Sequence, residues 1–587
     1  MNQHPDFLLN SIAEPKDLKN LSLEQLQQLA TEMRQLVLEK DAAIGGHVGP
    51  NLGIMETTLA FHYVFDSPKD KIVWDVSHQA YGHKMLTGRK LGFLDPEHYQ
   101  DVSGYTSPTE SCHDFFTIGH TSTSVSLAVG LAKARDLLNA KENIVALIGD
   151  GSLSGGMAFE GLSNGATLNS NFIVVINDNQ MSIDENKGGI YQGLAQLRAT
   201  NGQDPNNPFI AMGYDYRYVN DGNDLAAMIT AFSEVKDCDH PIILHINTLK
   251  GKGYQRAEED KMTYHWRGAF DLKTGQLKNT SSAESYDDVI LAELDQQLKQ
   301  QKPIIAITAA IPGVFKLKEF EAKHPANYID VGIAEQHSIT FATGLAKRGA
   351  RPVVFQNSTF LQRAYDQLSQ DMALNEQPVV IIVQGGINGG SRTHLGMFDI
   401  PYLTSIPNIE YLAPTSKEEL VAMLRWALTQ TNKPVVIRKP NGPVVSRPNA
   451  QADFSTITYQ SLQKGQKVAL LGLGDFFDLA VETGKLLETN LGIKPTIINP
   501  ISAATLDQTT LEQLKDNHDL VVTLENGSLE GGFGQKIAQY YASSSMKVCS
   551  FGAQKKFTDC SQSQLFAQNH LTADLICNDL KQILQLG

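Results

Sequence analysis

Short apolar runs alternate with amphipathic helical patterns along most of the chain. The first helical pattern begins after Ser22, which forms a capping box with Gln25. Its apolar face consists of Leu23, Leu26, Ala30, Met33 and Val37. The runs typical of buried strands are 71–76, 143–148, 171–177 and 240–246, then 303–308, 327–333, 351–356, 377–383 and 433–439, and last 466–474, 494–500 and 519–526. Because strands separated by helices favour parallel pairing, the pattern predicts an α/β protein with doubly wound, mostly parallel sheets.

Two polar stretches, 271–288 and 447–460, interrupt the alternation. The chain has 587 residues, several times the length of a usual domain of roughly 100–200 residues. We therefore expect three domains, 1–280, 281–450 and 451–587.

Composition narrows the class of ligand. A formal net charge of −15 argues against a nucleic-acid partner, since such proteins usually present clustered lysine and arginine. The chain has no run of about 18 apolar residues and no basic segment followed by an apolar one at its start, so we expect neither a membrane span nor export. The five cysteines are scattered without CxxC spacing, which favours a reducing cytoplasm. Small molecules are the expected ligands.

The strand at 143–148 ends in Gly149-Asp150-Gly151. Glycines there allow phosphate oxygens to approach the backbone, but an aspartate repels phosphate unless a divalent cation lies between them. The next strand ends in Asn-Asp-Asn-Gln-Met at 177–181, about 25 residues later. The pair resembles the signature of thiamine diphosphate sites, which implies Mg²⁺ held by Asp150, Asn179 and the Met181 carbonyl. Gly151 and Ser152 are then expected on the diphosphate.

Other interpretations of the glycines are weaker. A lone Gly-Asp-Gly is more often a tight turn. A dinucleotide fingerprint needs GxGxxG and a P-loop needs GxxxxGK[ST], and the segment at 149–156 matches neither.

Thiamine chemistry also needs one carboxyl group beside the aminopyrimidine ring. The segment 328–346 places Glu335 just after a strand, at the start of a helix. Phe360, in 357–367, offers an aromatic face for the same ring. Structural roles are the alternatives, because a glutamate at a helix start complements the dipole and a single phenylalanine is usually core.

Eight motifs in sequence order resemble the transketolase-type enzymes, most closely the 1-deoxy-D-xylulose-5-phosphate synthase family. They are GGHVGPNLG, WDVSHQAYGHKMLTGR, GHTSTS, GDG, NDNQMSI, GIAEQH, STFLQRAYDQ and THLGMFD. The resemblance covers nearly the whole chain. It implies a diphosphate-binding domain, a pyrimidine-binding domain and a C-terminal domain, with thiamine diphosphate bound by the first two domains of one chain within a homodimer. It also implies a transferase of isoprenoid biosynthesis that decarboxylates pyruvate and condenses the two-carbon unit with an aldehyde, classically D-glyceraldehyde 3-phosphate.

The resemblance assigns roles to individual residues. His47, His78, His265 and His394 match active-site histidines, with His78 also on the cofactor, and Arg363 matches an arginine that faces bound pyruvate. His120, Thr121 and Ser122 match the diphosphate-side segment, and Tyr254 matches a cofactor-contacting tyrosine. Several histidines suit proton transfer near neutral pH, although any one of them alone is more safely structural.

Four positions depart from the family pattern. The family has a tyrosine, an arginine, an aspartate and a second arginine where this chain has Asn357, Gln384, the run Gly389-Gly390-Ser391 and Asn441. The two missing arginines are those expected on the acceptor phosphate. Arg392 and Lys439 lie beside these positions and are candidates to rebuild an anion site. A shortened segment, 187–207, indicates a smaller lid.

Two other functions stay open from sequence. One is a transketolase-like enzyme with a different donor or acceptor. The other is a catalytically silent relative that binds cofactor or a partner.

Overall fold

The computed structural model describes residues 4–279, 283–448, 451 and 453–584. The chain divides into two compact units, Met1–Ser281 with Gly332–Ala334, and Ser282–Val331 with Glu335–Gly587. We expected domain boundaries near 280 and 450. Both positions belong to segments, 280–282 and 449–450, that lie outside the described residues.

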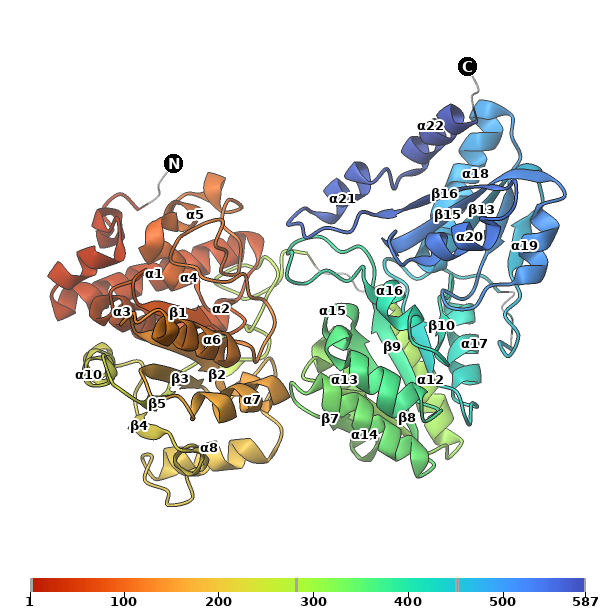
Figure 1. Cartoon of the computed structure of the whole chain (residues 1–587). Helices are drawn as coiled ribbons and strands as arrows, with labels where there is room; N and C mark the ends of the chain where they lie inside the picture. The colour runs from red at the N-terminus through yellow and green to blue at the C-terminus, as the bar shows by residue number, and fades with distance from the viewer. Residues whose placement is uncertain (1–3, 280–282, 449–450, 452, 585–587) are drawn as a thin grey trace. The chain divides into compact units, whose positions relative to one another are not determined.

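A five-stranded parallel sheet forms the centre of the first unit, in the order β1-β2-β3-β5-β4 (Figure 1). Its strands are β1 (Lys71–Trp74), β2 (Ile144–Gly149), β3 (Phe172–Asp178), β4 (Asp215–Val219) and β5 (Pro241–Asn247). Alternate side chains of each strand enter two separate apolar cores. For example, Val145 packs with the core that includes α1, and Ala146 packs with the core that includes α6. This two-sided burial is what the continuous apolar runs predict.

Helices cover both faces of this sheet. They are α1 (Leu23–Ile44), α2 (Val48–Gly53), α3 (Met55–Val64), α4 (Tyr81–Lys84), α5 (Leu91–Leu94), α6 (Ser124–Leu137), α7 (Gly156–Gly165), α8 (Gly189–Ala199), α9 (Pro208–Met212), α10 (Leu225–Val235) and α11 (Gln255–Glu259). The capping box at the start of α1 is confirmed, because Ser22 and Gln25 each bond the other's backbone N–H.

The second unit contains two sheets. The first is a six-stranded parallel sheet in the order β10-β11-β9-β8-β6-β7. Its strands are β6 (Ile304–Thr308), β7 (Tyr328–Asp330), β8 (Arg351–Asn357), β9 (Val380–Gln384), β10 (Glu410–Leu412) and β11 (Val435–Arg438). Its helices are α12 (Tyr286–Lys299), α13 (Leu317–Lys323), α14 (Glu335–Lys347), α15 (Ser358–Leu361), α16 (Asp399–Thr404) and α17 (Lys417–Ala427).

The other sheet has the order β12-β14-β13-β15-β16, with β12 antiparallel to β14 and the remaining pairs parallel. Its strands are β12 (Gln460–Gln463), β13 (Lys467–Leu473), β14 (Thr496–Asn499), β15 (His518–Ser528) and β16 (Lys547–Ala553). Its helices are α18 (Phe477–Leu491), α19 (Gln508–Leu514), α20 (Phe533–Tyr541), α21 (Gln562–Gln568) and α22 (Ala573–Ile583). The predicted class, three α/β domains with mostly parallel sheets, is confirmed.

Four strands, β4, β10, β12 and β16, were not predicted from the apolar pattern. β4 and β12 are edge strands with half-exposed or exposed residues, so they carry no continuous apolar run. β10 is only three residues long, and β16 is exposed or half-buried over its first four residues. Among the described residues, no helix is both long enough and apolar enough to cross a bilayer.

Candidate active site

Two neighbouring strands of the first sheet end at the predicted metal site. Gly149 of β2 lies opposite Asn177 of β3 in parallel register, so Asp150 and Asn179 follow at the same edge. Asp150 is 1% exposed, and its two oxygens accept hydrogen bonds from Gly151 N (2.9 Å) and Asn186 Nδ2 (2.8 Å). The side chains of the predicted ligands therefore share one sheet edge.

The oxygen atoms at this edge are short of positive partners. Asn179 Oδ1 is buried and has no hydrogen-bond partner among the described residues. Burial, together with the nearby Asp178 carboxylate, raises the pKa of Asp150 to about 8. Met181 follows, in an antiparallel bridge with Glu185. A divalent cation would satisfy the orphaned amide oxygen and favour the ionised carboxylate, so the residues present fit Mg²⁺ shared with phosphate oxygens.

The glycines of this loop are required by close packing. A Cβ on Gly151 would lie 2.6 Å from Ser182 Cβ, and a Cβ on Gly155 would lie 2.2 Å from Ser122 Oγ. Ser122 has a φ of +73° and donates its hydroxyl to the Ser152 carbonyl at 2.8 Å. The predicted diphosphate segment that contains Ser122 is thus packed against the Asp150 loop.

Asp75, just after β1, anchors the same segment. Its carboxylate accepts hydrogen bonds from the backbone N–H groups of Ser122 (2.9 Å) and Ser124 (3.0 Å), and Ser124 begins α6. His120 and Thr121 immediately precede this turn and are half-buried. The segment therefore lies at the N-terminus of α6, where the Asp75 carboxylate fixes the backbone of the turn.

Three of the four predicted histidines form one cluster. The ring centroids of His47 and His78 are 5.0 Å apart, and those of His265 lie 5.1 Å from His78 and 5.9 Å from His47. Lys250, which is 1% exposed, donates from Nζ to His265 Nδ1 (3.0 Å) and to the Ser182 carbonyl (2.6 Å). Burial lowers the pKa of Lys250 to about 7, and burial with this lysine lowers the pKa of His265. The environment of His265 therefore favours its neutral imidazole.

One buried amide fixes two of these histidines. Asn51 Nδ2 donates to the backbone carbonyls of His47 (2.7 Å) and His78 (2.8 Å). Its Oδ1 accepts from Tyr81 N at 2.9 Å, and Asn51 is 0% exposed. The two segments that carry the histidines are held by a single side chain.

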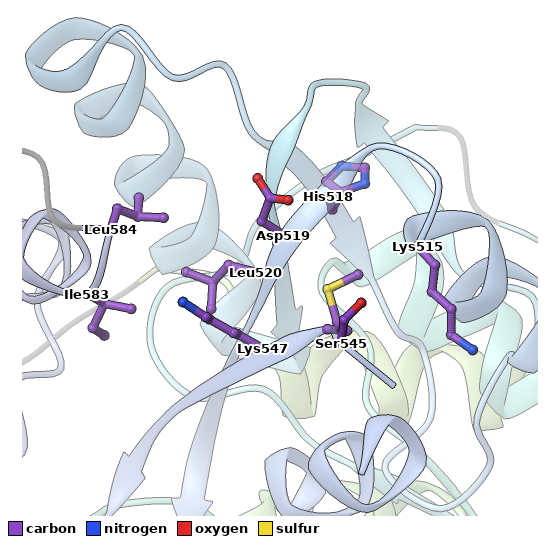
Figure 2. Close-up of a pocket in the computed structure, with 9 residues that line it drawn as sticks. Lys515, His518, Asp519, Leu520, Ser545, Lys547, Ile583 and Leu584 are labelled. Carbon is purple, nitrogen blue, oxygen red and sulfur yellow. The ribbon is translucent and has the colours of Figure 1, made fainter. Parts of the chain in front are cut away.

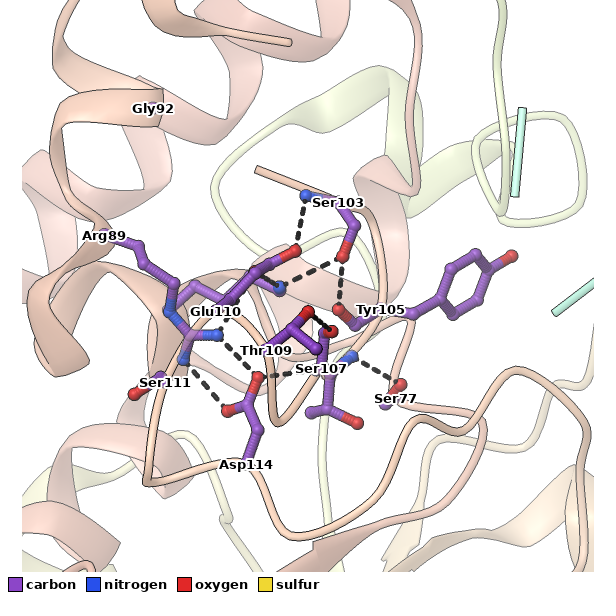
Figure 3. Close-up of polar contacts among 12 residues, drawn as sticks. Ser77, Arg89, Gly92, Ser103, Tyr105, Ser107, Thr109, Glu110, Ser111 and Asp114 are labelled. Atoms are coloured by element: carbon purple, nitrogen blue, oxygen red, sulfur yellow. Dashed lines mark hydrogen bonds and ion pairs between the residues drawn. The ribbon is translucent and has the colours of Figure 1, made fainter. Parts of the chain in front are cut away.

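A polar network places Tyr105 beside the same cluster (Figure 3). Arg89 pairs with Asp114 (2.5 Å), which also accepts the Ser107 N–H (2.7 Å). The Tyr105 ring points away from this network in Figure 3, and its centroid is 5.9 Å from that of the His47 ring. Burial raises the pKa of Tyr105 above its usual range, so its hydroxyl keeps its proton.

Tyr254 lies in a different environment. Its hydroxyl donates to the Leu272 carbonyl at 2.9 Å, and its ring packs edge-on against Tyr264 at 5.4 Å. The structure thus places it in an aromatic group beside α11.

The remaining predicted residues gather in the second unit. Glu335 begins α14 and is 4% exposed, with Oε2 lying 3.5 Å from Arg363 Nη1. This oxygen has no hydrogen-bond partner among the described residues, and burial raises the pKa of Glu335 although Arg363 opposes the shift. The Phe360 ring stands edge-on to His394 at 5.7 Å, and burial lowers the pKa of His394 to about 4. A buried, protonatable carboxyl group and an aromatic face therefore occur in the same unit, as an aminopyrimidine site requires.

Three family models match the chain in succession. Residues 9–207 match 1-deoxy-D-xylulose-5-phosphate synthase, 284–444 match the transketolase pyrimidine binding domain, and 458–566 match the transketolase C-terminal domain. Curated proteins named 1-deoxy-D-xylulose-5-phosphate synthase are similar over almost the full length. That of Natranaerobius thermophilus is 37% identical over 91% of this chain and 90% of its own, and that of Chlorobaculum tepidum is 38% identical over 97% of both.

The chain belongs to the 1-deoxy-D-xylulose-5-phosphate synthase family. It is an enzyme of the transketolase type, and its family is one that uses thiamine diphosphate. Among solved structures, a split-gene transketolase aligns with 52% of this chain at 22% identity and a TM-score of 0.46.

The positions that depart from the pattern of the synthase family lie at the carboxyl edge of the second sheet. Asn357 ends β8 and Gln384 ends β9, directly opposite each other in register. Asn441, just after β11, donates from Nδ2 to the Gly385 carbonyl (2.8 Å) and to Asp475 (3.1 Å). Amide groups thus occupy an edge where this family was expected to present a tyrosine and two arginines.

Lys439 and Arg392, the two candidates to rebuild the anion site, both form ion pairs with carboxylates. Lys439 is 5% exposed, and its Nζ lies 2.7 Å from both carboxylate oxygens of Asp287. Arg392 pairs with Asp559 at 2.5 Å and is half-exposed. Because Lys439 is already neutralised by a buried carboxylate, it has no free charge for an acceptor phosphate.

Sequence reasoning missed several residues of the site. Asn51, Lys250 and Asn186 contact predicted residues through hydrogen bonds from other segments, and Tyr105 does so through ring packing. Lys250 had one available signal, since it lies in Lys250-Gly251-Lys252-Gly253 directly after β5. The others become visible only when the chain is folded.

A separate pocket of about 500 Å³ lies in the C-terminal part of the second unit. Figure 2 shows Lys515, His518 and Lys547 around it, where β15 and β16 begin. Ligands of parallel sheets bind at the opposite, carboxyl ends of the strands. This pocket is therefore distinct from the candidate site.

Proposed function

We propose that the protein is a Mg²⁺- and thiamine diphosphate-dependent carboligase. It decarboxylates pyruvate and joins the two-carbon unit to an aldehyde; its curated relatives are named 1-deoxy-D-xylulose-5-phosphate synthase. The observation that carries the proposal is the orphaned Asn179 oxygen beside the buried Asp150 carboxyl at one sheet edge. Such a pair needs a cation and is otherwise costly to bury.

In this proposal, Asp150, Asn179 and the Met181 carbonyl hold Mg²⁺. Backbone and side-chain donors of Gly151 and Ser152, with the segment of His120, Thr121 and Ser122, bind the diphosphate. The close packing of the two loops around Gly155 and the N-terminus of α6 support this assignment. We assign Tyr254, from the aromatic group beside α11, to contact with the cofactor.

The second unit supplies the pyrimidine site. Glu335 would hold a proton for the aminopyrimidine, because burial favours its protonated form. Phe360 would offer an aromatic face to the cofactor, and Arg363 would pair with the carboxylate of pyruvate. When bound, thiamine diphosphate supplies the carbon nucleophile that makes loss of CO₂ feasible.

The histidines handle protons at the reacting oxygen atoms. The rings of His47, His78 and His265 are held together, and imidazole can donate or accept a proton at the acceptor carbonyl. His394, beside Phe360, acts from the second unit. Lys250 orients the His265 ring by donating a hydrogen bond to its Nδ1.

We further propose a cytoplasmic homodimer with three domains, 1–280, 281–450 and 451–587. All five cysteines are free thiols, which suits a reducing compartment. Sedimentation of the purified protein tests the oligomeric state.

The test of the function is release of CO₂ from carboxyl-labelled pyruvate. Turnover should require both Mg²⁺ and thiamine diphosphate and should rise when an aldehyde such as D-glyceraldehyde 3-phosphate is added. Turnover of xylulose 5-phosphate without pyruvate would instead support a transketolase activity. Cofactor binding without any turnover would support a silent relative.

A further inference from the structure

Two unpaired oxygen atoms lie on neighbouring strands at the carboxyl edge of the second sheet. Asn357 and Gln384 are register partners at the ends of β8 and β9. Asn357 Oδ1 and Gln384 Oε1 are both buried, and neither has a hydrogen-bond partner among the described residues. Buried acceptors are normally satisfied, so a ligand with hydrogen-bond donors is missing from this edge.

A third oxygen lies beside the same loop. The loop after β9 is packed closely against two amide groups. A Cβ on Gly386, two residues after Gln384, would lie 2.8 Å from Asn526 Nδ2 and 3.0 Å from Asn441 Nδ2. Both amides donate to Oδ2 of Asp475, at 2.7 and 3.1 Å. Oδ1 of Asp475 is buried and has no hydrogen-bond partner in the described part of the chain. Its one cationic neighbour among the described residues is Arg438, whose Nη1 lies 4.0 Å away and which also pairs with Asp399, so one arginine faces two carboxylates and the edge keeps a negative charge.

The basic groups that follow these strands already face carboxylates. Arg438 is 3% exposed and donates to Asp399 at 2.6 and 3.1 Å. Lys439 is held by Asp287, as described above. These pairs leave the positive charge of both residues compensated, and a phosphate dianion at this edge would meet uncompensated acceptor oxygens.

The same edge adjoins the proposed cofactor ring site. Phe360 lies three residues after Asn357, in the helix that follows β8, and packs against His394. An aldehyde that reacts there would extend its other carbons past the ends of β8 and β9. Hydroxyl groups on those carbons are donors of the kind that Asn357 and Gln384 lack.

We propose that the acceptor is an uncharged hydroxyaldehyde, whose hydroxyl groups donate to Asn357 Oδ1 and Gln384 Oε1. This inference rests on the proposed carboligase function and names its acceptor class. In the reaction, the bond between C1 and C2 of pyruvate breaks and CO₂ leaves. The electron pair left on C2 forms a bond to the aldehyde carbon, and the aldehyde oxygen takes up one proton. The product is an unphosphorylated 1-deoxyketose.

The first experiment compares three acceptors with the wild-type holoenzyme. D-glyceraldehyde, D-glyceraldehyde 3-phosphate and propanal are each assayed with pyruvate, Mg²⁺ and thiamine diphosphate, and both CO₂ and ketose are measured. We expect kcat/KM for D-glyceraldehyde to exceed that for the phosphate ester and for propanal by about tenfold or more, because a site built for hydroxyl groups rejects analogues that lack them.

The outcomes separate the two proposals. CO₂ release with a preference for D-glyceraldehyde 3-phosphate overturns the acceptor class and leaves the carboligase function standing. CO₂ release with equal use of propanal overturns it as well. No pyruvate consumption with any aldehyde overturns the carboligase function, and the acceptor class with it.

The second experiment uses Asn357→Leu and Gln384→Met, which keep the side-chain size and remove the oxygen. In each variant the ratio of kcat/KM for D-glyceraldehyde to that for propanal should fall about tenfold. The ratio is insensitive to a smaller active fraction, so partial misfolding does not imitate the effect. Gln370→Met, at an exposed glutamine, should leave the ratio unchanged. An unchanged ratio in both Asn357→Leu and Gln384→Met overturns the proposal.

Discussion

The strand ends of both units carry buried oxygen atoms without hydrogen-bond partners among the described residues, but the units differ in where their basic residues lie. Lys250 of the first unit donates to a carbonyl and to a histidine ring. In the first unit, the edge after β2 and β3 collects buried acids and an orphaned amide oxygen around Asp150. In the second, the edge after β9 and β11 has its basic residues locked onto carboxylates, such as Lys439 on Asp287. Parallel sheets fix where a ligand binds. The charge left uncompensated at the strand ends then determines which kind of ligand binds there.

The contrast extends beyond the strand ends. Asp41, near the C-terminus of α1, is fully buried in the first unit, and neither of its carboxylate oxygens has a hydrogen-bond partner among the described residues. Burial raises its pKa to about 8 although Lys40 is adjacent. In the second unit, the buried Asp399 accepts hydrogen bonds from Arg438 and from Tyr411 at 2.5 Å. Asp41 is thus a buried acid without a hydrogen-bond partner among the described residues, whereas Asp399 is a buried acid with two.

Glu335 is the acid of the second unit for which a catalytic proton is proposed. Glu335→Gln should lower kcat by about 10³-fold, since a positioned acid or base typically contributes 10²–10⁴-fold. The rate of CO₂ release from labelled pyruvate is the measurement. Glu482→Gln, at an exposed site on α18, serves as the control. Turnover within threefold of wild type in Glu335→Gln would mean that another group holds the proton.

The pairing in the second unit can be broken at Lys439. Lys439→Met leaves the buried Asp287 carboxylate unpaired and should lower the free energy of unfolding by about 3 kcal/mol. Urea denaturation measures the change. Lys417→Met breaks an exposed pair with Glu284 (3.0 Å) and should cost less than about 1 kcal/mol. Equal losses in the two variants would show that burial does not strengthen the Lys439 pair.

The metal site can be weakened at Asp150. Asp150→Asn removes a charged ligand and should weaken binding of thiamine diphosphate in the presence of Mg²⁺ by about 100-fold or more. Titration calorimetry with Mg²⁺ and thiamine diphosphate measures the affinity, and Asp239→Asn, at an exposed aspartate, is the matched control. Binding that is independent of Mg²⁺ in the wild type would contradict the proposed site.

The unpaired acid Asp41 predicts a pH dependence of stability. Between its usual pKa near 4 and its folded value of about 8, the folded protein keeps a proton that the unfolded chain has released. The free energy of unfolding should therefore fall as pH rises from 5 to 7, by up to about 1.4 kcal/mol per pH unit from this group. Asp41→Asn removes this contribution, so the variant should gain on the wild type over that range in urea denaturation. A difference that does not change with pH would show that Asp41 is ionised in the folded protein.

Sequence patterns predicted the elements of the fold wherever burial is continuous. The central strands β2 and β3 stand out because both of their faces are covered, and every residue of β3 is buried. β4 and β12 lie at sheet edges, where half-exposed residues remove the apolar signal. Strand detection from sequence therefore follows position in the sheet.

The candidate site was predictable where its residues are close in sequence. Asp150 and Asn179 follow adjacent strands, so parallel register alone brings them to one edge. Lys250 reaches His265 across a loop, and Asn186 reaches Asp150 from a distant segment. Such contacts depend on the path of loops, for which residue spacing gives no rule. The pairing of Lys439 with Asp287 is of the same kind, because Asp287 lies in α12.

The amide of Asn51 joins two parts of the chain that carry different histidines. Its two donated hydrogen bonds leave His47 and His78 with a common support. Because one side chain bonds both backbone segments, a displacement of one histidine also changes the position of the other. A substitution of Asn51 would therefore change the positions of both histidine rings.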